Sequence, residues 1–472
     1  MPVNPADSPI LGTLYGSDAM RAVFDETAYV QRMLDVEAAL ARVQGRLGII
    51  PADAAEAIVA AAKFENLRTE DLAASARNVG YPVVGLVNGL SKAAGTAGGW
   101  THWGATTQDI MDTATVLQVR DGLDLIETEL HAILTALAGQ ADRHRHTVMV
   151  GRTHLQQALP ITFGLKCAIW AMPFIAHLER LRQLRPRVQV VEFGGAAGTL
   201  ASLGGQGIAV MEALAADLGL GAPLAPWHVC RDSLAETVSL LGLISGSLAK
   251  IATDIILLAQ TEVGEVAEPY VAGRGASSTM PQKRNPIGSE YILAAARMVQ
   301  GLVPVMQGAM AQDHERATGP WQTEALVLPQ AFVLTHGALL HARAIAEGMV
   351  VDAARMRANL DITHGLIVSE SVMMGLAPLI GRGEAHHAVK HACDLALTEG
   401  VSLADALARD AAVASRLDRA AIEKLTDPAN YLGSTQAFVD RVVAAAGQGS
   451  PSRQPQPIRR SWRGAEPSRS GT

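Results

Sequence analysis

Cysteine is scarce in this sequence, and its scarcity excludes two classes of protein. The three cysteines, Cys167, Cys230 and Cys393, lie far apart, and no two of them form a CxxC pair. An odd number of dispersed cysteines excludes a disulfide scaffold and a zinc site built on cysteine pairs. The pattern instead predicts buried thiols in a protein of a reducing compartment.

Long apolar runs and an excess of basic residues are also lacking. No segment approaches the roughly 20 uninterrupted apolar residues of a membrane span, and residues 1–16 contain no basic stretch that leads into an apolar run. We therefore expect no membrane association and a cytoplasmic protein. The net charge is −7 and no basic stripe is present, so we expect no nucleic acid partner.

The residues that are abundant favour helices. Apolar residues make up 49% of the chain but aromatic residues only 4%, and the excess is Ala and Leu. These side chains lose little rotamer freedom in a helix, so the composition predicts an all-α fold. A chain of 472 residues exceeds the size at which one core keeps growing. We divide it into an N-terminal helical domain (1–109), a central bundle of long helices (110–350), a C-terminal helical domain (351–448) and a disordered tail (449–472).

Apolar spacing predicts the individual helices. Asp18 can cap a helix that continues to about Gly48, and a second helical stretch begins at Ala52. Residues 237–268 form one predicted helix, whose apolar residues recur at three- and four-residue steps: Leu241, Ile244, Leu248, Ile251, Ile255 and Leu258. A helix of about 30 residues is about 45 Å long, which favours a bundle shared between subunits. A monomeric bundle is the alternative.

Two breaks in the helical pattern are candidate active-site loops. Between Gly95 and Thr107 the sequence is rich in Gly, Thr, Trp and His, and Asp109 then opens another helix. Between Val271 and Gly288 it is rich in Gly, Ser and Pro. Successive backbone N–H groups of a Gly/Ser loop can form an anion-binding concavity, and an adjacent Lys and Asn can hold a carboxylate.

The second break carries a family resemblance. Residues 275–286, GASSTMPQKRNP, resemble the hallmark of the aspartase/fumarase superfamily, which includes argininosuccinate lyase and adenylosuccinate lyase. Residues 101–109, THWGATTQD, and 151–160, GRTHLQQALP, match the other regions that build this superfamily's site. The resemblance implies a helical homotetramer in which three subunits contribute to each site. It also implies a small di- or tricarboxylate substrate and no metal or organic cofactor, because the substrate carboxylate is itself the electron sink.

The motif positions imply roles for individual residues. Ser277 would be the base that removes the proton alpha to a carboxylate, and His154 the acid that protonates the leaving group. Serine is a poor base in water, so a mobile loop must close and stabilise its alkoxide. His102 would orient His154 or contact the substrate. The expected substrate-binding residues are His102, Thr106, Thr107, Gln108, Thr153, Gln156, Arg231, Ser278, Lys283, Asn285 and Arg316, with an ordinary ion pair as the alternative for the two arginines.

Over about residues 10–447 the resemblance is strongest to the 3-carboxy-cis,cis-muconate cycloisomerases, the lactonising enzymes of protocatechuate breakdown. Those enzymes often carry Trp at the position of His154. In lactonisation the nucleophile is an already ionised carboxylate, so no second acid is needed. An amine or hydroxide that leaves a substituted succinate must be protonated, and a histidine suits that task. His154 therefore keeps a β-eliminating lyase that releases fumarate as the alternative. A catalytically silent relative would carry damage in the Ser277 loop or at His154, and neither is damaged.

Overall fold

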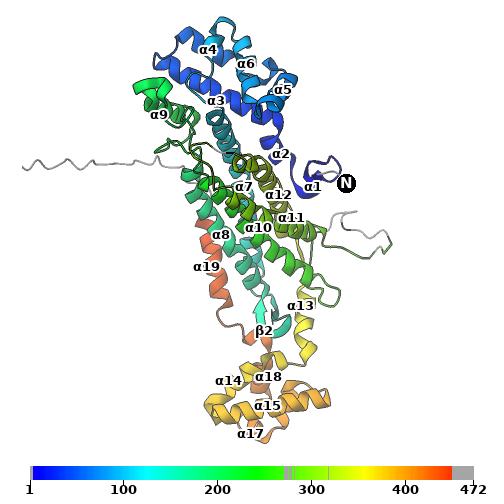
Figure 1. Cartoon of the computed structure of the whole chain (residues 1–472). Coiled ribbons are helices and arrows are strands. Elements are labelled where there is room, and N and C mark those ends of the chain that lie inside the picture. The colour runs from blue at the N-terminus through cyan, green and yellow to red at the C-terminus, as the bar shows by residue number, and fades with distance from the viewer. Residues whose placement is uncertain (1–3, 270–274, 276–278, 281, 317, 449–472) are drawn as a thin grey trace, which may run out of the picture.

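The computed structural model describes residues 4–269, 275, 279–280, 282–316 and 318–448. Over these residues the chain consists of helices and a few short strands, which confirms the all-α prediction. Figure 1 shows an elongated molecule, with long helices at its centre and a smaller group of helices at each end.

Long helices form the central bundle. They are α7 (Thr107–Arg143), α8 (Phe163–Val188), α10 (Asp232–Leu258), α11 (Ile287–Gly308) and α12 (Pro320–Gly348). Their apolar sides meet in one core, which contains Ile126, Leu181, Leu241 and Leu339. The six apolar residues predicted to recur along α10 are all buried, as the helical spacing requires.

Two smaller helical groups flank the bundle (Figure 1). The N-terminal group contains α1 (Gly12–Tyr15), α2 (Asp18–Phe24), α3 (Glu26–Arg46), α4 (Ala52–Ala61), α5 (Thr69–Val79) and α6 (Val83–Ala93), with α9 (Gly207–Leu218) against α3. At the other end, α13 (Ala353–Leu360) leads into α14 (Ser369–Ile380), α15 (Arg382–Glu399), α16 (Leu403–Arg409), α17 (Ala411–Ala414) and α18 (Arg419–Thr426). Each group has a hydrophobic cluster of its own.

The last described helix leaves the C-terminal group. α19 (Thr435–Gln448) packs along α7 and α8 and buries Val439 in the central core. The division of the chain after residues 109, 350 and 448 stays a proposal. Because α19 lies against the central bundle, the chain passes from the bundle to the C-terminal helices and then back to the bundle.

Strands are few in the described residues. β1 (Val148–Thr153) and β2 (Gln156–Thr162) form an antiparallel hairpin after α7, and β3 (Val266–Ala267) pairs with β4 (Val350–Val351). The motif at residues 151–160, for which no strand was predicted, thus forms most of a hairpin.

The prediction of one helix from Asp18 to about Gly48 is wrong. Ser17 rather than Asp18 caps the first helix, through a hydrogen bond from Met20 N to its side chain. Asp25 then takes an extended backbone, ends α2 and caps α3 by accepting a bond from Ala28 N at 2.7 Å. An Asp side chain satisfies the free N–H groups of a new helix turn, so it favours this break over helix continuation.

The prediction that one helix spans residues 237–268 is also wrong at its C-terminal end, because α10 stops at Leu258. The backbone carbonyl of Val263 accepts hydrogen bonds from Arg355 Nε at 3.0 Å and Asn359 Nδ2 at 2.8 Å. Gly264 follows with a φ of +62°. Side chains of α13 therefore bind carbonyls that a longer helix would have used internally.

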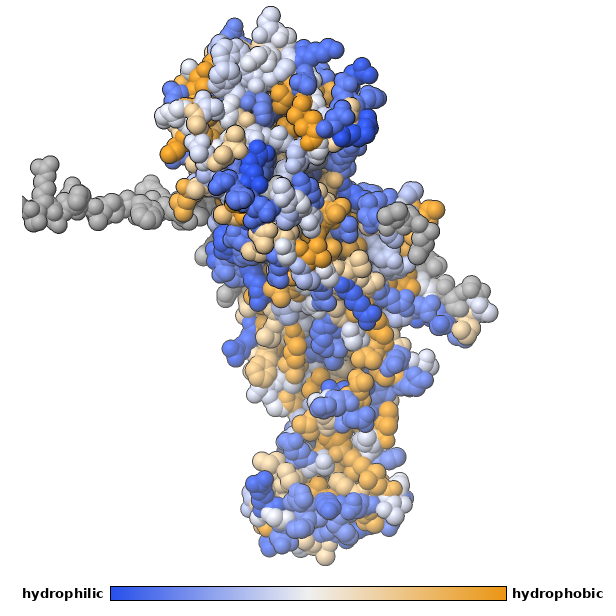
Figure 2. All heavy atoms as spheres, viewed as in Figure 1, coloured by the Kyte–Doolittle hydropathy of each residue, from blue (hydrophilic) through white to orange (hydrophobic). Residues whose placement is uncertain are grey.

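α10 and α12 are, by length and composition alone, apolar enough to cross a membrane. In its most apolar window, α12 is 67% buried within this chain but α10 only 44%. The uncovered side of α10 includes Leu243, which is 53% exposed. Figure 2 shows further hydrophobic residues at the surface along the bundle. The single chain thus leaves an apolar bundle face uncovered.

Candidate active site

The three motif segments lie at separate places on the chain. Thr106 caps the N-terminus of α7, while the β1–β2 hairpin follows its C-terminus. A helix of 37 residues is about 55 Å long at 1.5 Å per residue. Figure 1 shows β2 near the C-terminal helices and far from the N-terminal group. Within one chain, therefore, the first and second motif segments do not meet.

Two predicted substrate-binding residues do meet at the first segment. Arg316 Nη1 donates to Thr106 Oγ1 at 2.7 Å, although 210 residues separate them. The backbone N–H of Thr106 donates to Asp109 Oδ2 at 2.9 Å, which fixes the first turn of α7. Thr106 and Arg316 are both partly exposed. A guanidinium beside a helix N-terminus can bind a carboxylate.

Asp109 also attaches a distant glycine segment to this end of α7. Its two carboxylate oxygens accept bonds from the backbone N–H groups of Gly194 and Gly195, each at 3.0 Å. His228 Nε2 lies 2.7 Å from Asp109 Oδ1. All three contacts are buried, so the carboxylate holds the loop beneath the first motif in one conformation.

Glu192 lies next to this network and was missed by the sequence analysis. Its carboxyl group accepts a bond from Trp227 N at 2.6 Å and lies 3.3 Å from His228 Nε2. Burial, followed by the charges of Asp112 and Asp109, raises the pKa of Glu192 to about 9. Glu192 therefore carries a proton at neutral pH.

Ligand atoms of Asp109, Glu192 and His228 lie within 4.8 Å of one another, a spacing that a metal ion could use.

Gln108 and Arg231 lie inside the protein rather than at an open surface. The amide of Gln108 donates to Asp112 Oδ2 at 3.0 Å and to the carbonyl of His228 at 2.9 Å. Arg231 donates to Asp112 Oδ2 at 2.7 Å and from Nε to Glu324 Oε1 at 2.8 Å. Arg231 is 1% exposed. The structure therefore shows the ion pair that was the alternative for Arg231, and it does not bring these two side chains to the surface occupied by Thr106.

His102 has a buried partner that the sequence analysis also missed. His102 Nδ1 donates to Glu37 Oε1 at 2.6 Å across 65 residues. Burial lowers the pKa of His102, but the charge of Glu37, the hydrogen bond to it and the charge of Asp109 outweigh burial, so the pKa is raised above its usual value. A Glu in an apolar helical stretch was the only local signal for this pair.

The second motif presents His154 at the tip of the β1–β2 hairpin. Thr153 and Gln156 are paired across the strands, and His154 and Leu155 form the two-residue turn. Both turn residues have positive φ, 52° and 61°, where Asn and Gly are usual. His154, Thr153 and Gln156 are exposed, and Leu155 is 74% exposed. Strained, exposed backbone of this kind is concentrated at functional sites.

A partly buried ion pair supports this hairpin close to its tip. Arg152 forms two hydrogen bonds with the Glu265 carboxylate, at 2.9 and 2.7 Å. Asn359 Nδ2 donates to the same carboxylate at 2.7 Å. These contacts tie the hairpin to the segment after α10 and to α13, so its tip is held in a fixed position.

Ser277 and Ser278 of the third motif lie outside the described residues. At the loop's ends, Asn285 N donates to Gly275 O at 3.0 Å, and Lys283 is exposed. Glu268 accepts bonds from Ser289 N at 2.7 Å and Gly288 N at 3.1 Å. The Glu268 carboxylate, at the start of the loop, thus caps the N-terminus of α11, where the loop ends. This contact holds the two ends of the loop together.

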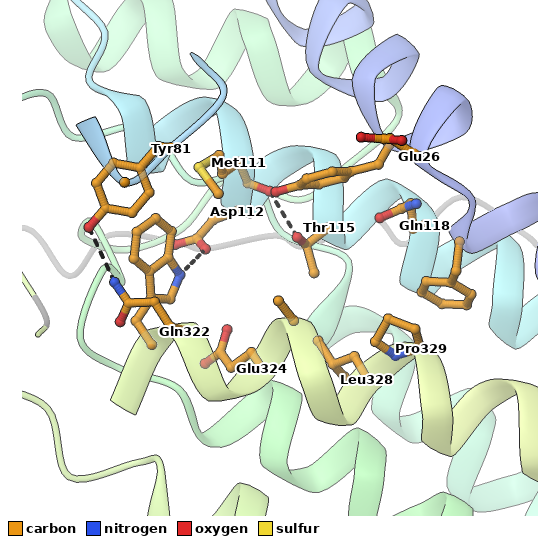
Figure 3. A pocket seen from close by; sticks show the side chains of 15 residues that line it. Glu26, Tyr81, Met111, Asp112, Thr115, Gln118, Gln322, Glu324, Leu328 and Pro329 are labelled. Carbon is orange, nitrogen blue, oxygen red and sulfur yellow. Dashed lines mark hydrogen bonds between the residues drawn. The ribbon is translucent and has the colours of Figure 1, made fainter. Parts of the chain in front are cut away.

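A cavity of about 500 Å³ opens beside α7 and α12. The Trp321 indole donates to Asp112 Oδ1 at 3.0 Å. Gln322 Nε2 donates to the Tyr81 hydroxyl at 3.2 Å, and Figure 3 shows these two side chains at one side of the cavity. Met111 and Thr115, which also line it, continue the face of α7 that begins at Thr107. Aromatic and apolar side chains form much of its wall. No Lys, Arg or His is among the described lining residues, so an anionic group would find no counter-charge there.

The family models that match this chain are described as "Lyase", over residues 15–301, and "Adenylosuccinate lyase C-terminus", over residues 365–442. The 3-carboxy-cis,cis-muconate cycloisomerase of Pseudomonas aeruginosa is 47% identical over 90% of this chain and 94% of that protein. Trans-aconitate decarboxylase 1 of Mycosarcoma maydis is 46% identical over 92% of this chain and 88% of its own length. The crystal structure of the 3-carboxy-cis,cis-muconate lactonizing enzyme from Pseudomonas putida has a TM-score of 0.89 and 44% identity, covering 93% of this chain and 99% of that one.

Proposed function

Because this chain belongs to the lyase family of the aspartase/fumarase superfamily, we propose that it lactonises 3-carboxy-cis,cis-muconate reversibly. The observation that carries the proposal is identity of 47% to a cycloisomerase of that name over 90% of the chain. All three motifs are intact over that length. A β-eliminating lyase acting on a substituted succinate is the second candidate, and the presence of His154 favours it.

In this proposal Ser277 transfers the proton. During lactonisation a substrate carboxylate oxygen adds to a carbon–carbon double bond, and the Ser277 hydroxyl gives its proton to the neighbouring carbon. In the reverse direction the Ser277 alkoxide removes that proton, alpha to a carboxylate. Ser278, Lys283 and Asn285 bind this carboxylate as negative charge builds on it. Thr106 and Arg316, whose side chains meet, bind a carboxylate at the other end.

We further propose a tetramer whose sites each contain segments of three subunits. Three observations support it: the first two motif segments lie far apart along the molecule, an apolar face of the bundle is uncovered, and His154 and Leu155 project from a supported hairpin. Under this arrangement the His154 hairpin of one subunit reaches the Thr106–Arg316 surface of another. Thr107 contributes from the first segment, and Thr153 and Gln156 from the hairpin. Gln108 and Arg231 act from beneath the surface, by holding Asp112.

An ultraviolet time course tests the proposed function. Purified enzyme is offered 3-carboxy-cis,cis-muconate in one cuvette, and argininosuccinate, adenylosuccinate or trans-aconitate in others. We expect rapid loss of the conjugated-diene absorbance in the first and no reaction in the rest. Fumarate formed from a succinate, with the diene unchanged, would replace the cycloisomerase by the lyase. Reaction of trans-aconitate alone would contradict both.

The substitution His154→Trp separates the two candidate reactions. Lactonisation needs no second acid, so we expect its kcat/KM to stay within about tenfold of wild type, while elimination is lost. His154 is exposed at the hairpin tip, so the fold should tolerate the change. The measurement is kcat/KM for the diene and for any succinate that reacts. Equal loss of both activities would contradict this division of roles.

A further inference from the structure

Glu37 is a buried carboxylate that pairs with His102. It lies in the middle of α3 and is 1% exposed, and its Oε1 accepts a hydrogen bond from His102 Nδ1–H at 2.6 Å. Its second oxygen, Oε2, is buried without a hydrogen-bond partner in the described structure. A buried carboxylate with one oxygen unpaired destabilises a fold. Its presence therefore points to a role at the site.

The backbone at His102 is held in an unfavourable conformation by the same helix. His102 has a φ of +56°, in the left-handed region that only a few per cent of non-glycine residues adopt, His, Asn and Asp more often than the others. Gln44, seven residues after Glu37 on α3, donates to the carbonyl of Trp103 at 2.7 Å. Two α3 side chains thus fix consecutive residues of the motif. The bond to Glu37 orients the imidazole ring, and the bond from Gln44 to the Trp103 carbonyl holds the adjacent main chain.

This arrangement leaves one ring nitrogen available to a ligand. Nδ1 is bound to Glu37, so Nε2 is the remaining donor, and the His102 side chain is 21% exposed while that of Glu37 is 1% exposed. Thr106, which binds Arg316, is four residues further along the same segment. His102 thus lies on the same segment as Thr106, which is proposed to bind a substrate carboxylate.

The charges around His102 favour its protonated form. Glu37 on α3 and Asp109 on α7 both act on it with negative charge, against the effect of burial. Arg316, before α12, is the cation bound at this end of α7, and its guanidinium donates to Thr106. A protonated imidazole donates from both nitrogens, to Glu37 on one side and to a ligand on the other.

We propose that Glu37 is a positioning residue that presents the Nε2–H of a cationic His102 to a carboxylate of the substrate. The proposal deepens the proposed function, since it rests on the substrate being a di- or tricarboxylate. It does not depend on whether that substrate is lactonised or cleaved. Glu37 itself does not touch the substrate.

Calorimetric binding of fumarate between pH 6 and 9 tests the proposal on the intact oligomer. In the wild-type protein we expect the affinity to fall as pH rises through the pKa of His102, because the cation is lost. Glu37→Gln keeps an acceptor for Nδ1–H but removes the charge, so the fall should occur at lower pH. At a pH above both pKa values, the variant should bind fumarate about tenfold more weakly for each unit by which the pKa of His102 drops.

Two controls make the result decisive. His102→Gln should bind fumarate weakly and without this pH dependence, and Glu37→Asp should restore part of the wild-type profile. The same pH dependence in wild type and Glu37→Gln would overturn the proposal, as would a wild-type protein that does not bind fumarate. If Glu37→Gln fails to fold, ring-carbon NMR of labelled histidine in the wild type, assigned with His102→Gln, replaces it. A His102 pKa at or below its usual value would then be the contrary result.

The fumarate-binding experiment tests the role of Glu37, and the ultraviolet assay tests the proposed reaction, so either proposal can fail without the other. Silence in every cuvette of the ultraviolet assay, together with a shifted binding profile in Glu37→Gln, would remove the proposed reaction and keep the role of Glu37. Turnover of the diene with identical binding profiles would do the reverse.

Discussion

Ser277→Ala is expected to lower kcat by about 10²–10⁴-fold, the range that a positioned acid or base contributes. The methyl side chain can neither give nor accept the proton alpha to the carboxylate. KM should change little, because Ser278, Lys283 and Asn285 remain. Steady-state kinetics on whichever substrate the ultraviolet assay identifies provide the measurement.

Ser278→Ala is the matched control for this change, one residue along the same loop. Its expected effect is mainly a higher KM, because the proposal gives Ser278 a binding role and no proton to transfer. Light scattering must show the same subunit number for both variants and wild type. Activity of Ser277→Ala within about tenfold of wild type would refute its assignment as the base.

Arg231→Met is expected to lower the free energy of unfolding by about 3–5 kcal/mol at neutral pH, the usual cost of removing one partner from a buried ion pair. The Asp112 and Glu324 carboxylates, 2% and 4% exposed, would lose the guanidinium that now binds both. Burial already raises the pKa of Glu324, against the lowering effect of Arg231. Urea denaturation at fixed protein concentration measures the loss.

The loss of stability in Arg231→Met should also depend on pH. Without Arg231 the pKa of the buried Glu324 carboxyl rises further above its unfolded value. A carboxyl of raised pKa is tolerated while protonated and destabilises the fold as pH rises through that pKa. The difference from wild type should therefore be larger at pH 8 than at pH 5.

Arg187→Met is the control for the loss of an arginine as such. Arg187 pairs with Glu236, but the two side chains are 51% and 43% exposed, so its loss should cost about 0.5 kcal/mol or less. If Arg231→Met were as stable as Arg187→Met but raised KM, Arg231 would bind substrate as the motif position suggested, rather than support the fold.

Much of the architecture was predictable because it depends on neighbours in the sequence. The spacing of Leu241, Ile244 and Leu248 defines a buried helix face wherever that helix packs. Errors occurred where a side chain offers the backbone a competing hydrogen bond. Asp25 ends α2 by capping α3, and Arg355 and Asn359 both bind the Val263 carbonyl that follows α10. The first is a local choice between two conformations, and the second depends on a helix about 90 residues away.

By itself, the sequence determined the helical class, the family and the three motif segments, because periodicity and motifs are properties of contiguous residues. Tertiary structure decided what individual polar residues do. Arg231 and Arg316 looked alike in the sequence, yet one is buried between two carboxylates and the other donates to Thr106 at the surface. Glu37 became a partner of His102 only because α3 packs against the segment that precedes α7. The effect of a charge depends on burial and on which opposite charges the fold brings within reach, and residues far apart in the chain determine both.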